Sequence, residues 1–337
     1  MKPTSIKDIA DSLNVSKTLV SLVLNNKAAN YGISKQTQEL VFEKAKELNY
    51  KPNRIAQGLR LGKSRSIGLI VPDISNTFYS RISRHIGDLV DDKDYNLMIY
   101  NTDEDVEKEK KIIETLLERH VDGIILTSTS IQAKEIQLLE KNDVPYVLVD
   151  RKMEEIDTHY VGIDNYRNAY EAVESLIKNG AKKIASISVG PLNISTLEER
   201  KNGYFACLKD NNIEANEDHN ITVSYNNISE DLSEKLNELF KQADRPDALF
   251  IANNKLAIET LKKLKSLNIR IPEDISIASF DDIPLFDILP YPISTVAQPV
   301  MDICKSATEI LFKEINSKSD TEIEKQNIIL LGDLIKR

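Results

Sequence analysis

The sequence predicts a small all-α head of the helix-turn-helix type, followed by a larger two-lobed α/β body with parallel sheets. Three observations support this prediction. Two short amphipathic helices flank a tight turn near the N-terminus, apolar strand segments alternate with helix-length stretches beyond residue 66, and basic residues gather at the start of an acidic chain. With 337 residues, of which 41% are hydrophobic, the chain can bury more than one core.

The first 25 residues carry the helix-turn-helix pattern. Asn14, which tolerates a left-handed backbone, stands in the expected turn. Apolar residues recur at helical spacing on both sides of it, at Ile6, Ile9, Ala10 and Leu13 and again at Val20, Val23 and Leu24. The other face of the second helix is short and polar, which suits contacts with phosphates and base edges in a DNA major groove. The predicted DNA contacts on it are Ser16, Lys17, Thr18, Ser21 and Asn25. An ordinary helical hairpin is the alternative.

A third helix is expected from about Ser34 to Leu48, with Val41 and Ala45 on its apolar face. The stop signal Tyr50-Lys51-Pro52-Asn53 ends it. The run from Arg54 to Leu61 that follows is too short for a stable isolated helix, and Gly58 weakens it further. We therefore expect this run to be disordered when free, with a plain flexible linker as the alternative.

The charge of the chain changes sign near residue 66, where the predicted head ends and the body begins. Residues 1–66 contain twelve Lys and Arg against five Asp and Glu, whereas the remaining 271 residues contain 32 against 48. A basic head on an acidic body indicates a polyanionic partner for the head alone. No apolar signal segment and no run of eighteen apolar residues occurs, so we expect a cytoplasmic protein without a membrane partner. Cys207 and Cys304 lie far apart and are expected to be reduced, buried thiols.

The body contains eight segments that resemble strands, and they alternate with helical stretches. A short internal repeat supports two similar lobes. Tyr100-Asn101 precedes a helix and then Asp122, and Tyr225-Asn226 precedes a helix and then Asp247, 125 residues later. The expected strands are 66–72, 95–101, 122–128, 145–150, 182–190, 220–225, 247–253 and 275–282.

Ligands of open parallel sheets bind beyond the carboxyl ends of the strands, and polar residues follow most of the expected strands here. Aspartate and asparagine suit neutral sugars, Phe78 or Tyr79 can stack on C–H surfaces, and a phosphorylated sugar would add a need for Arg and hydroxyls. The alternatives are local, such as a turn cap at Asp281, a helical ion pair at Arg200, or backbone bonds at Thr127 and Ser128. The predicted ligand contacts are Asn76, Phe78, Thr127, Ser128, Asp150, Arg151, Ser195, Arg200, Asn253 and Asp281, and the same rule points to Asp73, Ser75, Thr129, Ser130, Asn254 and Asp282.

Enzyme motifs are missing from the sequence. It contains no phosphate-binding glycine motif and no G-x-S-x-G, and its four histidines match no metal-ligand or base–nucleophile spacing. We therefore expect no enzymatic activity, no cofactor and no metal. An α/β enzyme acting on a sugar or sugar phosphate and fused to a DNA-binding head is the alternative.

Three stretches resemble the lactose/galactose repressor family. They are residues 2–25, residues 33–79 and the segment SIASFDD at 276–282, and the similarity runs essentially the whole length. The most specific part is AKELNYKPNRIAQGLR followed by SIGLIVPDISN. The resemblance implies a transcription regulator, most often a repressor, that binds double-stranded operator DNA as a homodimer and is controlled by a sugar or sugar phosphate.

The resemblance also implies boundaries. It places a DNA-binding domain at 1–50, a hinge at 51–65 and a ligand-binding and dimerisation domain at 66–337, built like a periplasmic sugar-binding protein. Lobe 1 is expected at about 66–163 plus 294–324 and lobe 2 at about 164–293 plus 325–337, with crossings near 163–165, 291–296 and 322–327.

Further contacts follow from the resemblance. Asp150, Arg200, Asn253 and Gln298 match ligand contacts of the family, and Thr4, Ser5, Asn53 and Gln57 join the predicted DNA contacts. In the hinge, Ala56 would pack closely and Leu59 would wedge between base steps of the minor groove, so that a ligand acts by deciding whether the hinge can fold.

The sequence also departs from the family pattern. Leu22 stands where many members have Arg, so we expect an apolar contact there, such as with a thymine methyl group. Asn254 stands where Asp is usual. The segment NKAANYGI is longer than in the lactose repressor and similar to the fructose-repressor branch, which favours a sugar phosphate or a fructose- or sucrose-type sugar as ligand.

Overall fold

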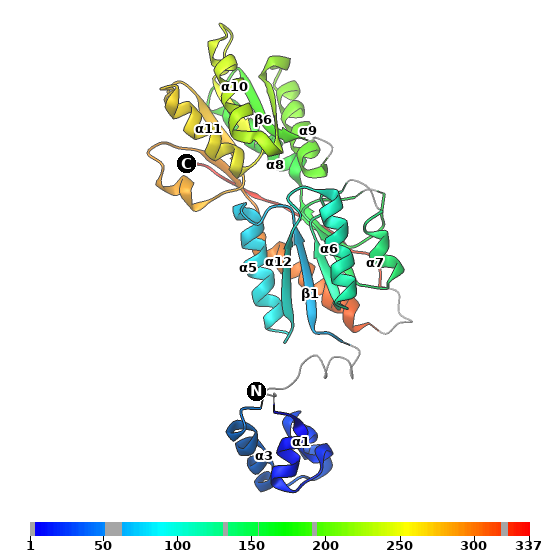
Figure 1. Ribbon diagram of the computed structural model, residues 1–337. Coiled ribbons are helices and arrows are strands. Elements are labelled where there is room, and N and C mark those ends of the chain that lie inside the picture. Colours follow the sequence, from blue (N-terminus) through cyan, green and yellow to red (C-terminus); the bar gives the residue numbers. More distant parts are fainter. Residues whose placement is uncertain (1–3, 51–62, 131–133, 154, 191–193, 318–322) are drawn as a thin grey trace. The chain divides into compact units, whose positions relative to one another are not determined.

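The computed structural model describes residues 4–50, 63–130, 134–153, 155–190, 194–317 and 323–337. The chain forms two compact units, Met1–Ser64 and Arg65–Arg337 (Figure 1).

The head contains the three expected helices, α1 (Ile6–Leu13), α2 (Lys17–Leu24) and α3 (Lys35–Glu47). Local chemistry sets where they begin and end. Ser5 forms a capping box with Asp8, Ser16 caps α2, and Asn14 takes the left-handed conformation, with φ of 52°, between them. A short 3₁₀ helix, η1 (Ala28–Tyr31), fills the segment before α3 and was not expected. The core consists of Ile9, Ala10, Val20, Val23, Ala28, Val41 and Ala45.

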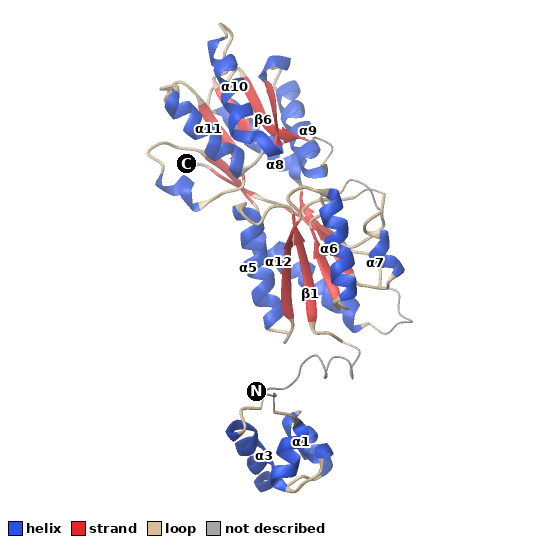
Figure 2. Cartoon of the chain, in the orientation of Figure 1, coloured by secondary structure: helices blue, strands red, loops and turns tan. Residues whose placement is uncertain are grey.

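The body contains two six-stranded sheets flanked by helices (Figure 2). The first sheet has the order β11-β5-β4-β3-β1-β2 and is parallel throughout. Its strands are β1 (Ser66–Val71), β2 (Asn96–Asn101), β3 (Gly123–Leu126), β4 (Tyr146–Val149), β5 (Tyr160–Ile163) and β11 (Asn327–Leu330). Its helices are α5 (Thr77–Asp91), α6 (Val106–Glu118), α7 (Gln137–Lys141) and α12 (Val300–Asn316).

The second sheet has the order β12-β10-β9-β8-β6-β7, in which only β12 is antiparallel. Its strands are β6 (Ile184–Gly190), β7 (Asn220–Ser224), β8 (Ala248–Ile251), β9 (Ser276–Phe280), β10 (Ser294–Ala297) and β12 (Asp333–Ile335). Its helices are α8 (Asn165–Lys178), α9 (Ser195–Asp210), α10 (Ile228–Lys241) and α11 (Asn254–Ser266), with the 3₁₀ helices η2 (Glu217–His219), η3 (Tyr225–Asn227) and η4 (Pro284–Ile288).

Side chains point alternately to the two faces of each sheet, and helices cover both faces. In β1, Leu69 joins the cluster formed with α5 and α12, whereas Ile70 joins the cluster formed with α6 and α7. In the second lobe, α8 and α9 pack on one face of the sheet, and α10 and α11 on the other. Strands buried on both faces are continuously apolar, which made β1, β3, β4 and β8 recognisable in the sequence, whereas the edge strands β2 and β7 are partly exposed.

The boundaries between the lobes differ from the expectation. The strand β10 pairs with β9 in the second sheet, and β11 pairs with β5 in the first. The chain therefore crosses after Ala297 and after Leu330, not near 291–296 and 322–327. The described residues of the first lobe lie within 65–163 plus 298–330, and those of the second within 164–297 plus 331–337. These short strands belong where a neighbouring strand satisfies their backbone hydrogen bonds, which the sequence does not reveal.

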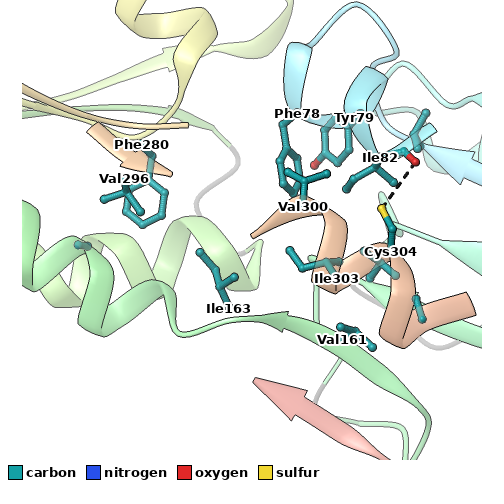
Figure 3. Packing of buried hydrophobic residues seen from close by; sticks show 14 of the residues in the cluster. Phe78, Tyr79, Ile82, Val161, Ile163, Phe280, Val296, Val300, Ile303 and Cys304 are labelled. Atoms are coloured by element: carbon teal, nitrogen blue, oxygen red, sulfur yellow. Dashed lines mark hydrogen bonds between the residues drawn. The ribbon is translucent and has the colours of Figure 1, made fainter. Parts of the chain in front are cut away.

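One buried apolar cluster extends through both lobes beside the crossings. Figure 3 shows Phe78 and Val300 of the first lobe, and Phe280 and Val296 of the second, among its members. Cys304 also belongs to it, and its thiol contacts the carbonyl oxygen of Ile82 at 3.7 Å. Burial raises the pKa of Cys304 and of Cys207 to about 12, so both free thiols are protonated and poorly reactive.

No helix among the described residues is both long enough and apolar enough to cross a bilayer.

Candidate functional site

A polar cleft lies between the two lobes of the body, beyond the carboxyl ends of the strands. It is lined by residues of both lobes and opens to solvent, which is typical of small-molecule sites between two lobes. Eight of the predicted ligand contacts line it, namely Asn76, Phe78, Asp150, Arg151, Arg200, Asn253, Asp281 and Gln298.

Three predicted contacts do not line this cleft. Thr127 is buried at the end of β3, and the Ser128 hydroxyl donates to the carboxylate of Glu109 at 2.6 Å. The Ser195 hydroxyl accepts a hydrogen bond from the backbone N–H of Lys152 at 3.0 Å. Ser128 and Ser195 face a separate hollow beside the cleft. The Ser128 hydroxyl also bonds the backbone of Ser130, as the alternative for strand-end hydroxyls states. Ser195, at the start of α9, satisfies a backbone group as well.

Two aspartates project into the cleft from opposite lobes. Asp150 follows β4 and Asp281 follows β9, and both take the left-handed conformation, with φ of 69° and 67°. Left-handed backbone is uncommon for residues other than glycine and often marks a functional position. The Tyr79 hydroxyl donates to Asp150 at 2.9 Å, and the side-chain amide of Gln298 donates to Asp281 at 2.7 Å.

Burial raises the pKa of the Asp150 carboxyl. The neighbouring guanidinium groups of Arg200 and Arg151 and the Tyr79 hydroxyl oppose this rise, while the negative charge of Asp281 adds to it. The negative charge of Asp281 therefore acts on the pKa of Asp150 from the opposite lobe.

Arg200 is held rigidly by α9 and its surroundings. Its Nε donates to Asn165 Oδ1 at 2.8 Å and its Nη1 donates to the carbonyl oxygen of Ala252 at 2.7 Å. The guanidinium lies 3.9 Å from the centre of the Phe280 ring. These contacts fix the orientation of its charge in the cleft.

Arg151 forms a two-pronged ion pair with Glu104, at 2.8 and 2.6 Å. Glu104 reaches it because Asp103 and Glu104 both adopt left-handed backbone after β2, with φ of 54° and 59°. Glu104 was not predictable from the sequence, because the segment TDED has the composition of an ordinary polar loop.

Ten other residues that line the cleft were not among the predicted ligand contacts named at the start of this section. Two of them carried a signal, because Asp73 follows the first strand and Tyr79 was named as a ring that could stack on a sugar. Tyr225 corresponds to Tyr100 in the internal repeat, and this correspondence could have indicated Tyr225 as a residue of the site. The remaining lining residues carried no recognisable signal, and they are Val189, Gly190, Ile194, Thr196, Leu197, Ile228 and Lys255.

The head presents the start of α2 to solvent. Ser16, Lys17 and Thr18 are exposed there, and the Ser16 hydroxyl also accepts the N–H of Leu19 at 3.1 Å. The predicted contacts Ser21, Leu22 and Asn25 are half-buried, and the Asn25 amide donates to the Ser21 carbonyl oxygen at 2.6 Å.

Two predicted DNA contacts of the head also support its fold. The Thr4 hydroxyl donates to the carbonyl oxygen of Leu48 at 2.8 Å, which joins the two ends of the head, and Ser5 caps α1. The predicted hinge contacts Asn53, Ala56, Gln57 and Leu59 lie outside the described residues.

A helix-turn-helix head joined to a body of two parallel-sheet lobes around a polar cleft defines a DNA-binding regulator of two domains. Residues 5–53 match the lacI family of bacterial regulatory proteins, and residues 173–337 match the periplasmic binding protein-like domain.

Relatives agree over nearly the full length. The chain is 34% identical over 315 residues to the ribose operon repressor of Halalkalibacterium halodurans, covering 94% of this chain and 91% of that one. It is 35% identical over 337 residues to the transcriptional regulator RegA of Clostridium acetobutylicum, covering 99% and 98%. Among solved structures, the complex of the transcriptional regulator CelR with cellobiose superposes with a TM-score of 0.72 at 25% identity, covering 99% of both chains.

The chain therefore belongs to the lacI family of bacterial regulatory proteins. It is a DNA-binding transcription regulator, and the enzyme alternative is not supported.

Proposed function

We propose that this regulator binds a two-fold symmetric operator as a homodimer and that a neutral sugar in the cleft controls its affinity for DNA. A protein that acts on operator DNA has its place in the cytoplasm. A single head of three helices reads only a few base pairs, and two heads related by a dimer axis match the two halves of a palindrome. The exposed polar start of α2 and the basic composition of residues 1–66 support the head as the DNA-binding part.

The charge balance of the cleft is the observation that supports a neutral ligand. The lining contains four carboxylates against three cations, namely Asp73, Glu104, Asp150 and Asp281 against Arg151, Arg200 and Lys255. Each of these cations already contacts groups of the protein, Arg151 through Glu104, Lys255 through Asp73, and Arg200 through Asn165 and Ala252. A phosphate group would meet a lining with excess negative charge, so a sugar without phosphate is favoured over the phosphorylated type.

The hydrogen-bonding groups of the cleft also suit hydroxyls. Gln298 Oε1 is buried and has no hydrogen-bond partner among the described residues. A buried acceptor without a donor is costly, and a ligand hydroxyl would supply one. The carboxylates of Asp150 and Asp281 accept further hydroxyl donors, and Phe78 offers an apolar ring beside them. The ribose operon repressor and the cellobiose complex among the relatives are in keeping with this class of ligand.

The ligand class can be tested on the full chain. We expect ribose, fructose or cellobiose to raise the melting temperature and to give a binding isotherm by calorimetry, and the corresponding phosphates to give neither. Arg200→Ala and Asp281→Asn should abolish binding. Glu198→Ala is the matched control, because Glu198 lies on the same helix as Arg200 but faces the neighbouring hollow. A phosphorylated sugar that binds more tightly than its parent would overturn the assignment.

The DNA-binding role can be tested by measuring operator affinity with and without the sugar. We expect sedimentation to show two chains per palindromic duplex and the affinity to fall steeply with salt, by a log–log slope of about 0.9 per phosphate contacted. One chain per palindrome, or an affinity that the bound sugar leaves unchanged, would contradict the proposal.

A further inference from the structure

At the rim of the cleft, the first turn of α11 in the second lobe contacts the loop before α5 in the first. Asn254 Nδ2 donates to Asn76 Oδ1 at 3.1 Å, and Lys255 Nζ lies 3.1 Å from the carboxylate of Asp73. Both contacts join the lobes directly and involve only groups of the protein.

The acceptor of the first contact is fixed by the fold. Asn76 Oδ1 also accepts the backbone N–H of Phe78 at 3.0 Å, as the N-cap of α5, so this oxygen must face the helix. Only a donor can approach it from the other side. Asn254 is 2% exposed and supplies this donor. Aspartate, which is usual at this position in the family that the sequence resembles, has no hydrogen to donate when ionised.

The second contact rests on an ionised Asp73. Partial burial favours the neutral acid, but hydrogen bonds from Ser75 and Lys255 outweigh it and hold the pKa of Asp73 below its usual range. Lys255 also lies 5.0 Å from the centre of the Tyr225 ring, which keeps its ammonium over the cleft.

We infer that Asn254 and Lys255 form, with Asn76 and Asp73, an interlobe clasp that holds the lobes of this chain together without a ligand. The consequence for sugar binding rests on the function proposed above. When closure is already favoured, less of the ligand's binding energy is spent on it, so affinity rises. The clasp residues are therefore determinants of how sensitively this regulator responds to its sugar.

The clasp can be tested by measuring the distance between the lobes in the full chain with no sugar present. Spin labels would be placed through Lys110→Cys on α6 and Glu234→Cys on α10, which are exposed positions in the first and second lobes. The buried native thiols, with pKa values raised to about 12, should not compete for the label.

Two variants remove the two contacts separately. Asn254→Asp replaces the donor by a carboxylate facing an acceptor oxygen, and Lys255→Gln removes the charge at a position exposed enough to leave the fold intact. Lys262→Gln is the matched control on the same helix, because Lys262 pairs with Glu259 within α11 and not with the other lobe.

We expect a single short distance in the starting protein and a second, longer population in Asn254→Asp, smaller in Lys255→Gln and absent in Lys262→Gln. High salt should lengthen the distances only where Lys255 is present. The affinity for sugar should fall about tenfold in Asn254→Asp, as expected for one lost hydrogen bond. Distance distributions in Asn254→Asp and Lys255→Gln that match the starting protein would overturn the clasp, even if sugars bind. If the distances respond but no sugar binds, the clasp holds and the proposed ligand class fails.

Discussion

Gly203 lies on α9 where this helix touches α8, and Gly203→Ala tests whether their close approach positions Arg200. A β-carbon at this position would lie 2.2 Å from the carbonyl oxygen of Tyr166 and 3.0 Å from the β-carbon of Ala169. A carbon atom and a carbonyl oxygen keep apart by about 3.3 Å, so the helices must separate locally by roughly 1 Å. Backbone atoms of Tyr166 cannot turn aside as a flexible side chain would.

The size of the effect follows from two opposing terms. Overpacking of this kind costs about 1–3 kcal/mol, while alanine gains about 1 kcal/mol over glycine in a helix. We therefore expect a net loss of up to about 2 kcal/mol in the free energy of unfolding. Arg200 lies one turn earlier on α9, and a shift of roughly 1 Å would stretch its hydrogen bonds to Asn165 and Ala252 beyond useful length. Affinity for the sugar should fall by about tenfold as a result.

Urea unfolding followed by circular dichroism measures the stability change. Gly87→Ala is the matched control, since Gly87 lies within α5 and the nearest atom to an added β-carbon, in Leu97, is 3.8 Å away. This control should gain about 0.4–1 kcal/mol. If Gly203→Ala proved as stable as Gly87→Ala, or kept full affinity for the sugar, the reasoning about the contact between α8 and α9 would be refuted.

Three further predictions concern the two units. Burial raises the folded-state pKa of Asp150, so the stability that this group contributes is present below its unfolded pKa and is lost as pH rises through the folded value. Asp150→Asn should therefore have a higher free energy of unfolding than the starting protein at about pH 7, and this difference should vanish near pH 4. Urea unfolding across this pH range would check it, and a difference that stays constant with pH would contradict it. Lys17→Ala should lower the salt slope of DNA binding by about 0.9, while Lys46→Ala on α3 should leave it unchanged, as fluorescence anisotropy titrations at several salt concentrations would show. Ser5→Ala removes the capping box with Asp8 and should cost the head about 1 kcal/mol, which would appear as faster hydrogen exchange in α1; unchanged exchange would disprove the role of the cap.

Periodic segments were predictable from the sequence because their chemistry is local. The helices of the head are predicted by the capping residues Ser16 and Ser34, the turn residue Asn14 and the spacing of apolar residues. Strands buried on both faces are predicted by their continuously apolar sequence. The missed strands β5, β10, β11 and β12 are three or four residues long. Whether so short a segment becomes a strand depends on which neighbour it meets in the folded chain, so the lobe boundaries were misplaced.

Part of the cleft lining was predictable from the geometry of parallel strands, and the rest was not. Parallel strands bring their carboxyl ends to one edge, so polar residues that follow them, such as Asp150 and Asp281, converge without any knowledge of the fold. Glu104 and Lys255 could not be found in this way, because their place depends on partners in distant segments, Arg151 and Asp73. The roles of the hinge residues in DNA binding stay predictions.

The order of strands in the first sheet has a consequence for the making of the protein. A chain grows from its N-terminus at about 5–20 residues per second and folds by domains as they emerge. The head is complete within residues 4–50, but the first lobe lacks α12 and β11 until residue 330 has been made. At these speeds the two events are separated by about 14–56 s. A nascent regulator therefore carries a finished DNA-binding head well before it has a working sensor, and a chain that terminates early keeps the first without the second.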